Sequence, residues 1–461
     1  MRKRFLSALL VFSMAAAALA GCGSEDKDKG SSDSTNKGAS SENNSSGTVS
    51  DGGKVLNIYC WNEEFKSRVT DYFPGYKKKD ATSGTIGDVT VKWNITPNEN
   101  NAYQDNLDAA LQKQESASAD EKVDVFLVEA DYALKYVNSE FAAPLTDLGV
   151  NDSDLSEQYQ YTKDVVTDSN GVLKGTSWQA APGVLFYNRE AAKEVLGSDD
   201  PAKVQEYVKD WETFGETAEK MKKAGYKIMS TANDSYRVYS NNVSSKWVED
   251  GKINIDDNIM KWVDDSKKLV DAKYTGAYDM WSDDWKKGFY PEGKVFCYFG
   301  PAWLVNFSMA ADTEGSIGNK GGWGATEGPQ GFYWGGTWIC AAAGSDNSGL
   351  IKDIMLQLTA NADIMKAISE GTDDFVNNQP VMEEMAESKY SSKILGGQNP
   401  LGIYCNGVKD LSLSNVTGYD LGCTEEFQHA MKNYFEGNAT KEEALDQFYK
   451  AVVEKYPDLT Y

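Results

Sequence analysis

The sequence contains few of the residues that enzymes use for catalysis and metal binding. It has one histidine, His429, among 461 residues, which argues against a histidine-based triad and against a metal site. No Cys-x-x-Cys sequence occurs, and no Gly-x-Ser-x-Gly, P-loop or Gly-x-Gly-x-x-Gly sequence follows a predicted strand. We therefore expect a protein that is not an enzyme and that uses no metal or cofactor. An exported glycoside hydrolase stays open, because it needs only two carboxylates at a suitable separation.

Long apolar runs are absent after the first 22 residues, since no later stretch reaches the 18 residues that a transmembrane helix needs. Residues 5–20 form a shorter apolar run behind three basic residues, which is typical of a secretory signal and too short for a spanning helix. The run ends in Leu-Ala-Gly-Cys, which resembles a bacterial lipobox, where the cysteine is acylated and the chain is cut before it. We expect residues 1–21 to be a signal peptide and Cys22 to carry acyl chains such as palmitate. An ordinary signal peptide with a chance cysteine is the alternative.

Apolar residues are also scarce just after Cys22. The segment over residues 22–53 consists mainly of Ser, Gly, Asn, Asp, Lys and Glu, so it cannot bury enough surface to offset the entropy of ordering. We expect a disordered tether with a typical reach of roughly 30 Å. The predicted location is the outer face of the cell membrane, and the length of the tether suits a Gram-positive surface.

Basic residues are outnumbered, with 46 lysines and arginines against 70 acids and a net charge of −24. This balance argues against nucleic acid as a partner and against direct attraction to anionic lipid. The membrane contact is therefore expected to run through the lipid anchor only.

Cysteines number six, and the predicted anchor uses one of them. The remaining five allow at most two disulfides. Cys60, Cys297 and Cys340 lie in apolar, strand-like runs and are expected to be small buried residues, while Cys405 and Cys423 are the one pair close in sequence.

The body after residue 53 has about 400 residues, more than one core usually serves, so two lobes are expected. Strands and helices alternate at its start, which predicts a parallel sheet covered by helices. The first predicted strands span residues 55–61, 89–96 and 123–128, with helices over 63–79 and 101–118 between them. Later predicted elements are helices over 211–224 and 256–273, strands over 226–230 and 294–299, and mainly helices after 348, with the last two starting at 425 and 441.

Four short segments carry a family resemblance. The sequence Trp-Gln-Ala-Ala-Pro-Gly-Val-Leu-Phe-Tyr-Asn at 178–188 and the sequence Gly-Lys-Val-Phe-Cys-Tyr-Phe-Gly-Pro-Ala-Trp at 293–303 resemble segments of the family 1 extracellular solute-binding proteins. Gly-Gly-Thr-Trp at 335–338 and Gln-Pro at 379–380 fall where that family makes its later crossings between lobes. These proteins are receptors of carbohydrate ABC importers and include maltose-binding protein. The chain departs from the family at 296–298, where Phe-Cys-Tyr replaces a frequent Ala-Met.

The resemblance implies an α/β fold of two lobes, the clamshell of type II-like periplasmic binding proteins, each with a mainly parallel sheet flanked by helices. Lobe 1 would hold 54–180 and 338–376, and lobe 2 would hold 184–334 and 380–461. Hinge crossings would lie near 178–188, 331–341 and 376–380. The ligand would be a mono- or oligosaccharide bound between the lobes, and the other partner would be an ABC permease. A monomer is expected.

Candidate ligand contacts follow from the chemistry of a sugar, whose C–H face packs on an indole and whose hydroxyls pair with carboxylates and amides. Such side chains follow the predicted strands that end near residues 60, 128 and 230, and others flank the predicted crossings. Polar side chains that lie within two positions of a candidate in the sequence include Asn233, Tyr236 and Asn377. The residues expected to contact ligand are Trp61, Asn62, Glu63, Glu64, Glu129, Asp131, Trp178, Asp234, Trp303, Trp334, Trp338 and Asn378.

Each candidate has a structural alternative. The indoles could be core residues, and the acids could cap or charge helix N-termini. Tyr187 is expected to be buried in its strand, and the spacing of Trp281, Trp285 and Phe289 at i, i+4 and i+8 predicts a buried helix stripe. A receptor for a cation such as a polyamine is the alternative ligand class, because aromatic walls and acids also suit an ammonium group.

Overall fold

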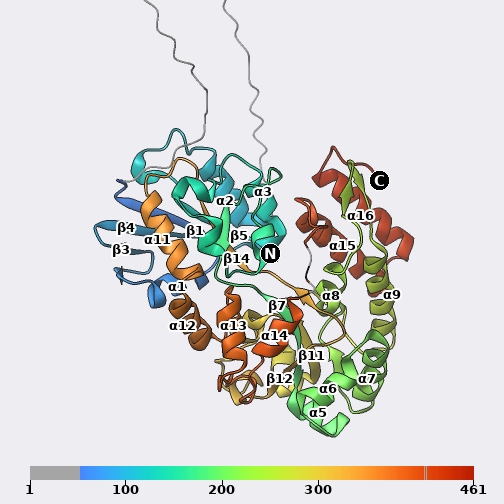
Figure 1. Ribbon diagram of the computed structural model, residues 1–461. Helices are drawn as coiled ribbons and strands as arrows, with labels where there is room; N and C mark the ends of the chain where they lie inside the picture. Colours follow the sequence, from blue (N-terminus) through green and yellow to red (C-terminus); the bar gives the residue numbers. More distant parts are fainter. Residues whose placement is uncertain (1–51, 410, 412) are drawn as a thin grey trace, which may run out of the picture. The chain divides into compact units, whose positions relative to one another are not determined.

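The computed structural model describes residues 52–409, 411 and 413–461 (Figure 1). The predicted signal peptide, Cys22 and all but the end of the predicted tether lie outside these residues. Within them, no helix has both the length and the apolar character needed to cross a membrane.

The first of two main sheets has seven strands in the order β2-β3-β4-β1-β5-β14-β6. Strand β1 runs parallel to β4 and to β5, and the remaining neighbours pair antiparallel. The strands are β1 (Val55–Cys60), β2 (Tyr76–Lys78), β3 (Ser83–Ile86), β4 (Val89–Ile95), β5 (Val125–Glu129), β6 (Gly175–Ser177) and β14 (Thr337–Ala341).

Helices cover both faces of this sheet because its central strands are apolar on both sides. In β5, Val125 and Leu127 belong to one core cluster, while Phe126 and Val128 belong to another, as the alternation of side chains along a strand requires. The covering helices are α1 (Glu64–Tyr72), α2 (Ala102–Leu111), α3 (Ala133–Val137), α4 (Gln160–Asp164), α11 (Ser348–Thr359) and α12 (Ala362–Thr372).

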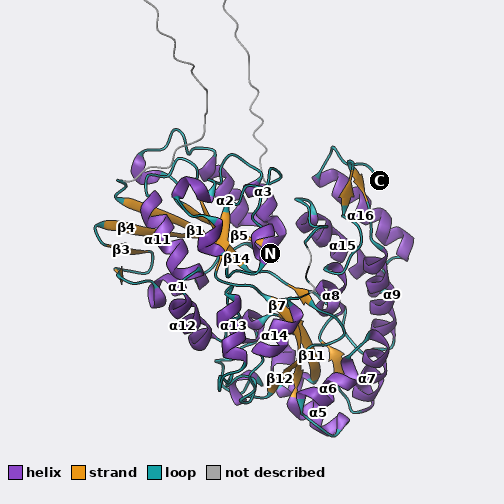
Figure 2. Cartoon of the chain, viewed as in Figure 1, coloured by secondary structure: helices purple, strands orange, loops and turns teal. Residues whose placement is uncertain are grey.

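The second main sheet has the strand order β12-β7-β11-β8, with β13 also paired to β7. Only β11 and β8 run parallel in it. Figure 2 shows the two groups of strands with helices around each. The strands are β7 (Pro182–Asn188), β8 (Lys227–Met229), β11 (Val295–Gly300), β12 (Trp323–Thr326) and β13 (Phe332–Tyr333), and helices near them are α5 (Arg189–Leu196), α6 (Pro201–Val208), α7 (Trp211–Lys223), α10 (Asp283–Lys286), α13 (Gln379–Ala386) and α14 (Leu401–Gly407).

A helical layer completes this part of the chain. Trp262, Phe427, Phe435 and Phe448 share one buried cluster, which joins segments far apart in sequence. The elements of the layer are α8 (Tyr236–Ser240), α9 (Asp257–Asp271), α15 (Asp420–Phe435), α16 (Lys441–Lys455) and the hairpin of β9 (Val248–Glu249) and β10 (Lys252–Ile253).

Three short segments link the two sheets, and we call them the crossings. Residues 178–181 join β6 to β7 as the first crossing, 334–336 join β13 to β14 as the second, and 373–378 join α12 to α13 as the third. Backbone hydrogen bonds tie the first crossing to the other two: Asn377 N donates to Trp178 O at 2.8 Å, and Trp334 N donates to Ala181 O at 3.2 Å.

Three structural predictions need correction. The sheets are mixed rather than mainly parallel, because strands such as β14 return from the other sheet without a crossover helix. The predicted helix over 63–79 ends at Tyr72, because Pro74 follows and cannot continue it. The stripe that begins at Trp281 is not helical there, since Trp281 has φ 70° and α10 starts two residues later.

Other elements differ from the predictions at their ends. Helix α2 ends at Leu111, seven residues before the predicted end, and α15 starts at Asp420 rather than at residue 425. Cys60, Cys297 and Cys340 are buried, as predicted, and they carry free thiols, as do Cys405 and Cys423.

Candidate ligand-binding site

A cavity of about 650 Å³ opens where the crossings meet the ends of several strands. Its volume is in the range of cavities that hold small ligands. Of the predicted contacts, eight line it: Trp61, Asn62, Glu64, Glu129, Asp131, Asp234, Trp303 and Trp334.

The parallel pairing of β1 with β5 explains why five of these residues meet. The carboxyl ends of parallel neighbours lie at the same edge of a sheet. Trp61, Asn62 and Glu64 follow β1, and Glu129 and Asp131 lie at the end of β5 and just beyond it, so the register places both groups at one edge.

The other four predicted contacts do not line the cavity. Glu63 precedes α1, and its side chain is 67% exposed and pairs with Lys66 at 2.7 Å. Trp178 is buried and stacks on Phe65, with ring centroids 5.5 Å apart. These positions agree with the structural alternatives of a charged helix start and a core indole.

Trp338 and Asn378 are also buried away from the cavity. Trp338 Nε1 donates to Thr162 O at 2.7 Å, and Thr337, one residue earlier in β14, is the residue that lines the cavity, because side chains alternate along a strand. Asn378 caps α13, its Oδ1 accepting from Val381 N at 3.0 Å.

Two aromatic platforms form the apolar part of the wall. The ring centroids of Trp303 and Trp334 are 5.0 Å apart at 65°, and those of Trp281 and Trp334 are 5.9 Å apart at 44°. Trp303 Nε1 donates to Trp334 O at 3.2 Å, which fixes the orientation of the Trp303 indole. Trp61 forms the other platform and packs edge-on against Tyr132.

Gly335 allows the second crossing to pass close to Trp303. Its φ is +66°, a conformation that favours glycine. A Cβ at this position would lie 3.3 Å from Trp303 Cζ2 and 3.6 Å from Glu129 Oε1. The glycine therefore keeps open the space between an indole and a carboxylate.

Four of the six carboxylates that line the cavity have cationic partners. Asp131 accepts two bonds from Arg237, one of 2.8 Å from Nη1 to Oδ1 and another from Nη2 to Oδ2. The other pairs are Glu64 with Arg68 at 3.5 Å, Asp279 with Lys432 at 2.6 Å and Glu425 with Lys455 at 3.1 Å.

Glu129 and Asp234 have no cation within ion-pairing distance among the described residues, and hydrogen bonds satisfy them instead. Glu129 Oε2 accepts from Asp131 N at 3.0 Å, and Asp234 Oδ1 accepts from Trp285 Nε1 at 2.6 Å. Burial, with added repulsion from Asp131, raises the pKa of Glu129 to about 8. Burial also raises the pKa of Asp234 to about 7. Near neutral pH, these two carboxyls can therefore hold a proton and donate hydrogen bonds.

Several cavity residues were not among the predicted contacts. Gln179 and Thr337 are adjacent in sequence to the predicted contacts Trp178 and Trp338, and the spacing of Trp281 predicts a buried helix stripe instead. One face of α15 also contributes to the wall, and its helical spacing is visible in the sequence once the helix is placed there. The α15 residues that line the cavity are Leu421, Thr424, Glu425, Gln428 and His429.

The wall thus offers flat rings, hydrogen-bond donors and acceptors, and compensated charge. No group of three or more His, Cys, Asp or Glu side chains within the described ranges could hold a metal ion. The arrangement suits recognition of a polar, uncharged molecule with apolar faces.

Comparisons with known proteins show which family the chain belongs to and which solved structures it resembles. Residues 76–394 match the family model described as "Bacterial extracellular solute-binding protein". A search of curated proteins finds no match. A crystal structure of an extracellular solute-binding protein family 1 member is similar, with a TM-score of 0.70, 17% identity and coverage of 86% of this chain and 99% of that one.

Two solved structures with bound sugars are also similar. The ABC transporter-associated binding protein of B. animalis subsp. lactis Bl-04, in complex with β-1,6-galactobiose, has a TM-score of 0.66 and 20% identity, with 89% of this chain and 99% of that chain covered. The galacto-N-biose/lacto-N-biose I-binding protein of Bifidobacterium longum, in complex with lacto-N-biose, has a TM-score of 0.65 and 14% identity, with 89% and 97% covered. These similarities confirm the predicted two-lobed α/β fold. The chain belongs to the bacterial extracellular solute-binding proteins.

Proposed function

We propose that this protein captures a mono- or oligosaccharide in the described cavity and delivers it to the permease of an ABC importer. The family membership supports capture of a solute outside the cell. The sugars named for similar structures, β-1,6-galactobiose, lacto-N-biose and acarbose among them, support a carbohydrate as the solute. The anchor in this proposal is lipid on Cys22, with residues 22–53 as the tether.

The observation that carries the proposal is the pairing of indoles with carboxyls in one wall. Trp303 and Trp334 offer ring surface for the C–H face of a sugar, and Glu129 lies beside them at Gly335. Hydroxyls around the edge of a sugar ring both donate and accept hydrogen bonds. A wall that combines ionised acids, protonated acids and amides can match both roles.

The charge balance favours a neutral sugar over the alternative of a polyamine. Four lining carboxylates are already paired with protein cations. The remaining two have pKa values raised by burial to about 8 for Glu129 and about 7 for Asp234. A cationic ligand would therefore have to displace a cation or a proton, whereas a neutral sugar requires neither.

Delivery requires that the lobes respond to the ligand. In the proposal, lobe 1 holds 54–180 and 338–376, lobe 2 holds 184–334 and 380–461, and the crossings act as the hinge. The cavity wall includes residues from both groups, such as Trp61 and Trp303. A ligand that contacts both would shift the population toward a closed state.

Isothermal titration of the purified protein against a panel of neutral glycans tests the proposal, with tryptophan fluorescence and small-angle scattering as readouts of closure. We expect one glycan class to bind with little dependence on ionic strength, whereas affinity for a polyamine would fall as salt rises. The glycans should be recovered intact, because release of reducing sugar would instead indicate a glycoside hydrolase. Absence of binding across the panel would overturn the proposal.

A further inference from the structure

A group of buried charged side chains lies directly behind the cavity wall. Glu64 lines the cavity from the first turn of α1, and Arg68 Nη2, one helical turn later, lies 3.5 Å from its Oε1. The same Nη2 lies 3.6 Å from Oδ2 of Asp374 in the third crossing. All three side chains are at most 11% exposed. Arg68 thus faces two buried carboxylates, of which only one reaches the cavity.

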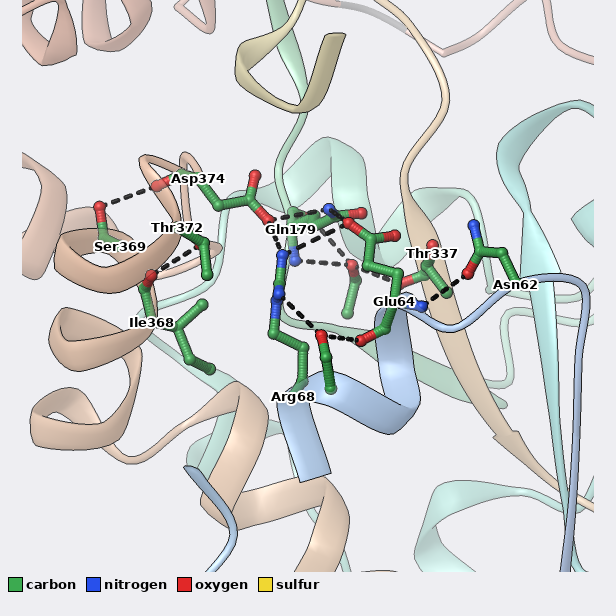
Figure 3. Close-up of polar contacts among 11 residues, drawn as sticks. Asn62, Glu64, Arg68, Gln179, Thr337, Ile368, Ser369, Thr372 and Asp374 are labelled. Carbon is green, nitrogen blue, oxygen red and sulfur yellow. Dashed lines mark hydrogen bonds and ion pairs between the residues drawn. The ribbon is translucent and has the colours of Figure 1, made fainter. Parts of the chain in front are cut away.

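Gln179 of the first crossing and Thr337 at the start of β14 complete this group, which we call the Arg68 network (Figure 3). Gln179 Nε2 donates to Glu64 Oε1 at 2.8 Å and to Asp374 Oδ2 at 2.8 Å. The Thr337 side chain hydrogen-bonds to Glu64. The carboxylate of Glu64 is therefore held by Arg68 of its own helix, by Gln179 of the first crossing and by Thr337 of β14. Arg68 itself does not line the cavity.

The protonation state of Glu64 in this network depends on the positive charge of Arg68. Burial raises the pKa of Glu64 to about 7, with Asp374 adding to the rise and Arg68 opposing it. The charged groups that face Glu64 are Arg68 from α1 and Asp374 from the third crossing. Without the guanidinium, two buried carboxylates would share a single amide, and burial would favour the protonated form of each.

We propose that Arg68 is a positioning residue that favours the ionised form of Glu64 and fixes its carboxylate at the cavity wall as the acceptor for a ligand hydroxyl. Arg68 acts through Glu64 and does not touch the ligand. The inference rests on the proposed function for the identity of the ligand, and on the network alone for the effect of Arg68 on Glu64. The proposed function and the effect of Arg68 on Glu64 can therefore be disproved independently of each other.

The first test is the pH profile of affinity, measured by calorimetry with the glycan that binds most tightly. In the unaltered protein, affinity should rise as pH increases through about 7, because the ionised carboxylate of Glu64 is a stronger hydrogen-bond acceptor than the protonated carboxyl. Arg68→Met should lower the affinity at pH 7 at least about tenfold, the loss expected when a charged acceptor is withdrawn. It should also move the midpoint to higher pH. Arg68→Lys should restore most of the affinity, and Glu64→Gln should bind weakly with a flat profile.

Lys66→Met is the matched control, since Lys66 is on the same helix and pairs with Glu63, which does not line the cavity. It should leave the midpoint unchanged. If Arg68→Met lowers stability but keeps the midpoint of the unaltered protein, Arg68 has only a structural role and the inference is overturned.

The second test needs no ligand. In protein labelled with ¹³C at glutamate carboxyls, the resonance that disappears in Glu64→Gln reports the titration of Glu64. Arg68→Met should raise the midpoint of that resonance, whereas an unchanged midpoint overturns the inference. If no glycan binds the unaltered protein but the midpoint rises, the proposed function fails and the control of Glu64 by Arg68 stands.

Discussion

Arg237 and Asp131 form a bidentate ion pair in the wall of the cavity, with Nη1 donating to Oδ1 at 2.8 Å and Nη2 donating to Oδ2. Arg237 comes from α8, which follows β8 of the second sheet, and Asp131 follows β5 of the first. Their side chains are 21% and 12% exposed. The pair therefore joins elements of the two sheets at the site itself, and its guanidinium also lies near Glu129.

Breaking this pair should destabilise the folded protein. Arg237→Met would leave Asp131 without its cation beside Glu129, and we expect the free energy of unfolding to fall by about 2 kcal/mol, less than for a fully buried pair. Urea denaturation measures the loss. The double variant Asp131→Asn with Arg237→Met should lose less than the sum of the single variants, because neither charge is then left unpaired. Additive losses would show that the pair contributes no coupling.

Trp303 and Trp338 should give opposite results, although both were predicted to contact ligand. Trp303→Ala removes an indole from the cavity wall, so affinity for the sugar should fall by roughly tenfold or more. Trp338→Ala empties a fully buried site and should lower the free energy of unfolding by about 3–5 kcal/mol. Calorimetry and urea denaturation on both variants separate the effects. A loss of stability without loss of affinity in Trp303→Ala would place that ring outside the binding surface.

The sequence could predict the part of the site that depends on strand order. Trp61 and Glu64 follow one predicted strand and Glu129 follows another, and the alternation of strands and helices indicated parallel neighbours whose ends would meet. That inference needed no knowledge of distant contacts. It does not show which of two successive side chains faces the cavity, and Thr337 rather than the predicted Trp338 lies in the wall.

Other residues of the cavity could not be predicted from the sequence, because their position depends on tertiary packing. The face of α15 that carries Gln428 reaches the cavity only because this helix packs near the end of β5. The spacing of Trp281 from Trp285 predicts a helix stripe, but the φ of 70° at Trp281 places this residue before α10. A local pattern cannot show where a helix starts when a positive φ intervenes.

The stability of the folded protein should depend on pH through Glu129. Its folded pKa of about 8 lies above the value of about 4.3 in an unfolded chain. Between these values, the folded carboxyl keeps a proton that the unfolded chain has released, so stability is greatest at the acidic end of this window and falls as pH rises through about 8. Thermal unfolding from pH 5 to pH 9 should show this decline, and Glu129→Gln should reduce its slope. An equal slope in the variant would show that Glu129 titrates normally.

Gly335→Ala should impair binding through the space that the glycine leaves open. The added Cβ would lie 3.3 Å from Trp303 Cζ2 and 3.6 Å from Glu129 Oε1, between the ring and the carboxyl that we propose contact the sugar. The positive φ of +66° adds a conformational cost of about 1–2 kcal/mol in the free energy of unfolding. Calorimetry should therefore show weaker binding, and urea denaturation should show modest destabilisation.

Gly87→Ala separates these two effects, because Gly87 has φ +56° and a Cβ there would meet nothing within 4 Å. Both variants should lose similar stability from the backbone conformation, since each forces alanine into the left-handed region. Only Gly335→Ala should lose affinity, because only its methyl group enters the space between Trp303 and Glu129. Equal affinities in the two variants would mean that the ligand does not occupy this space, and that the second crossing contributes to the fold without shaping the binding surface.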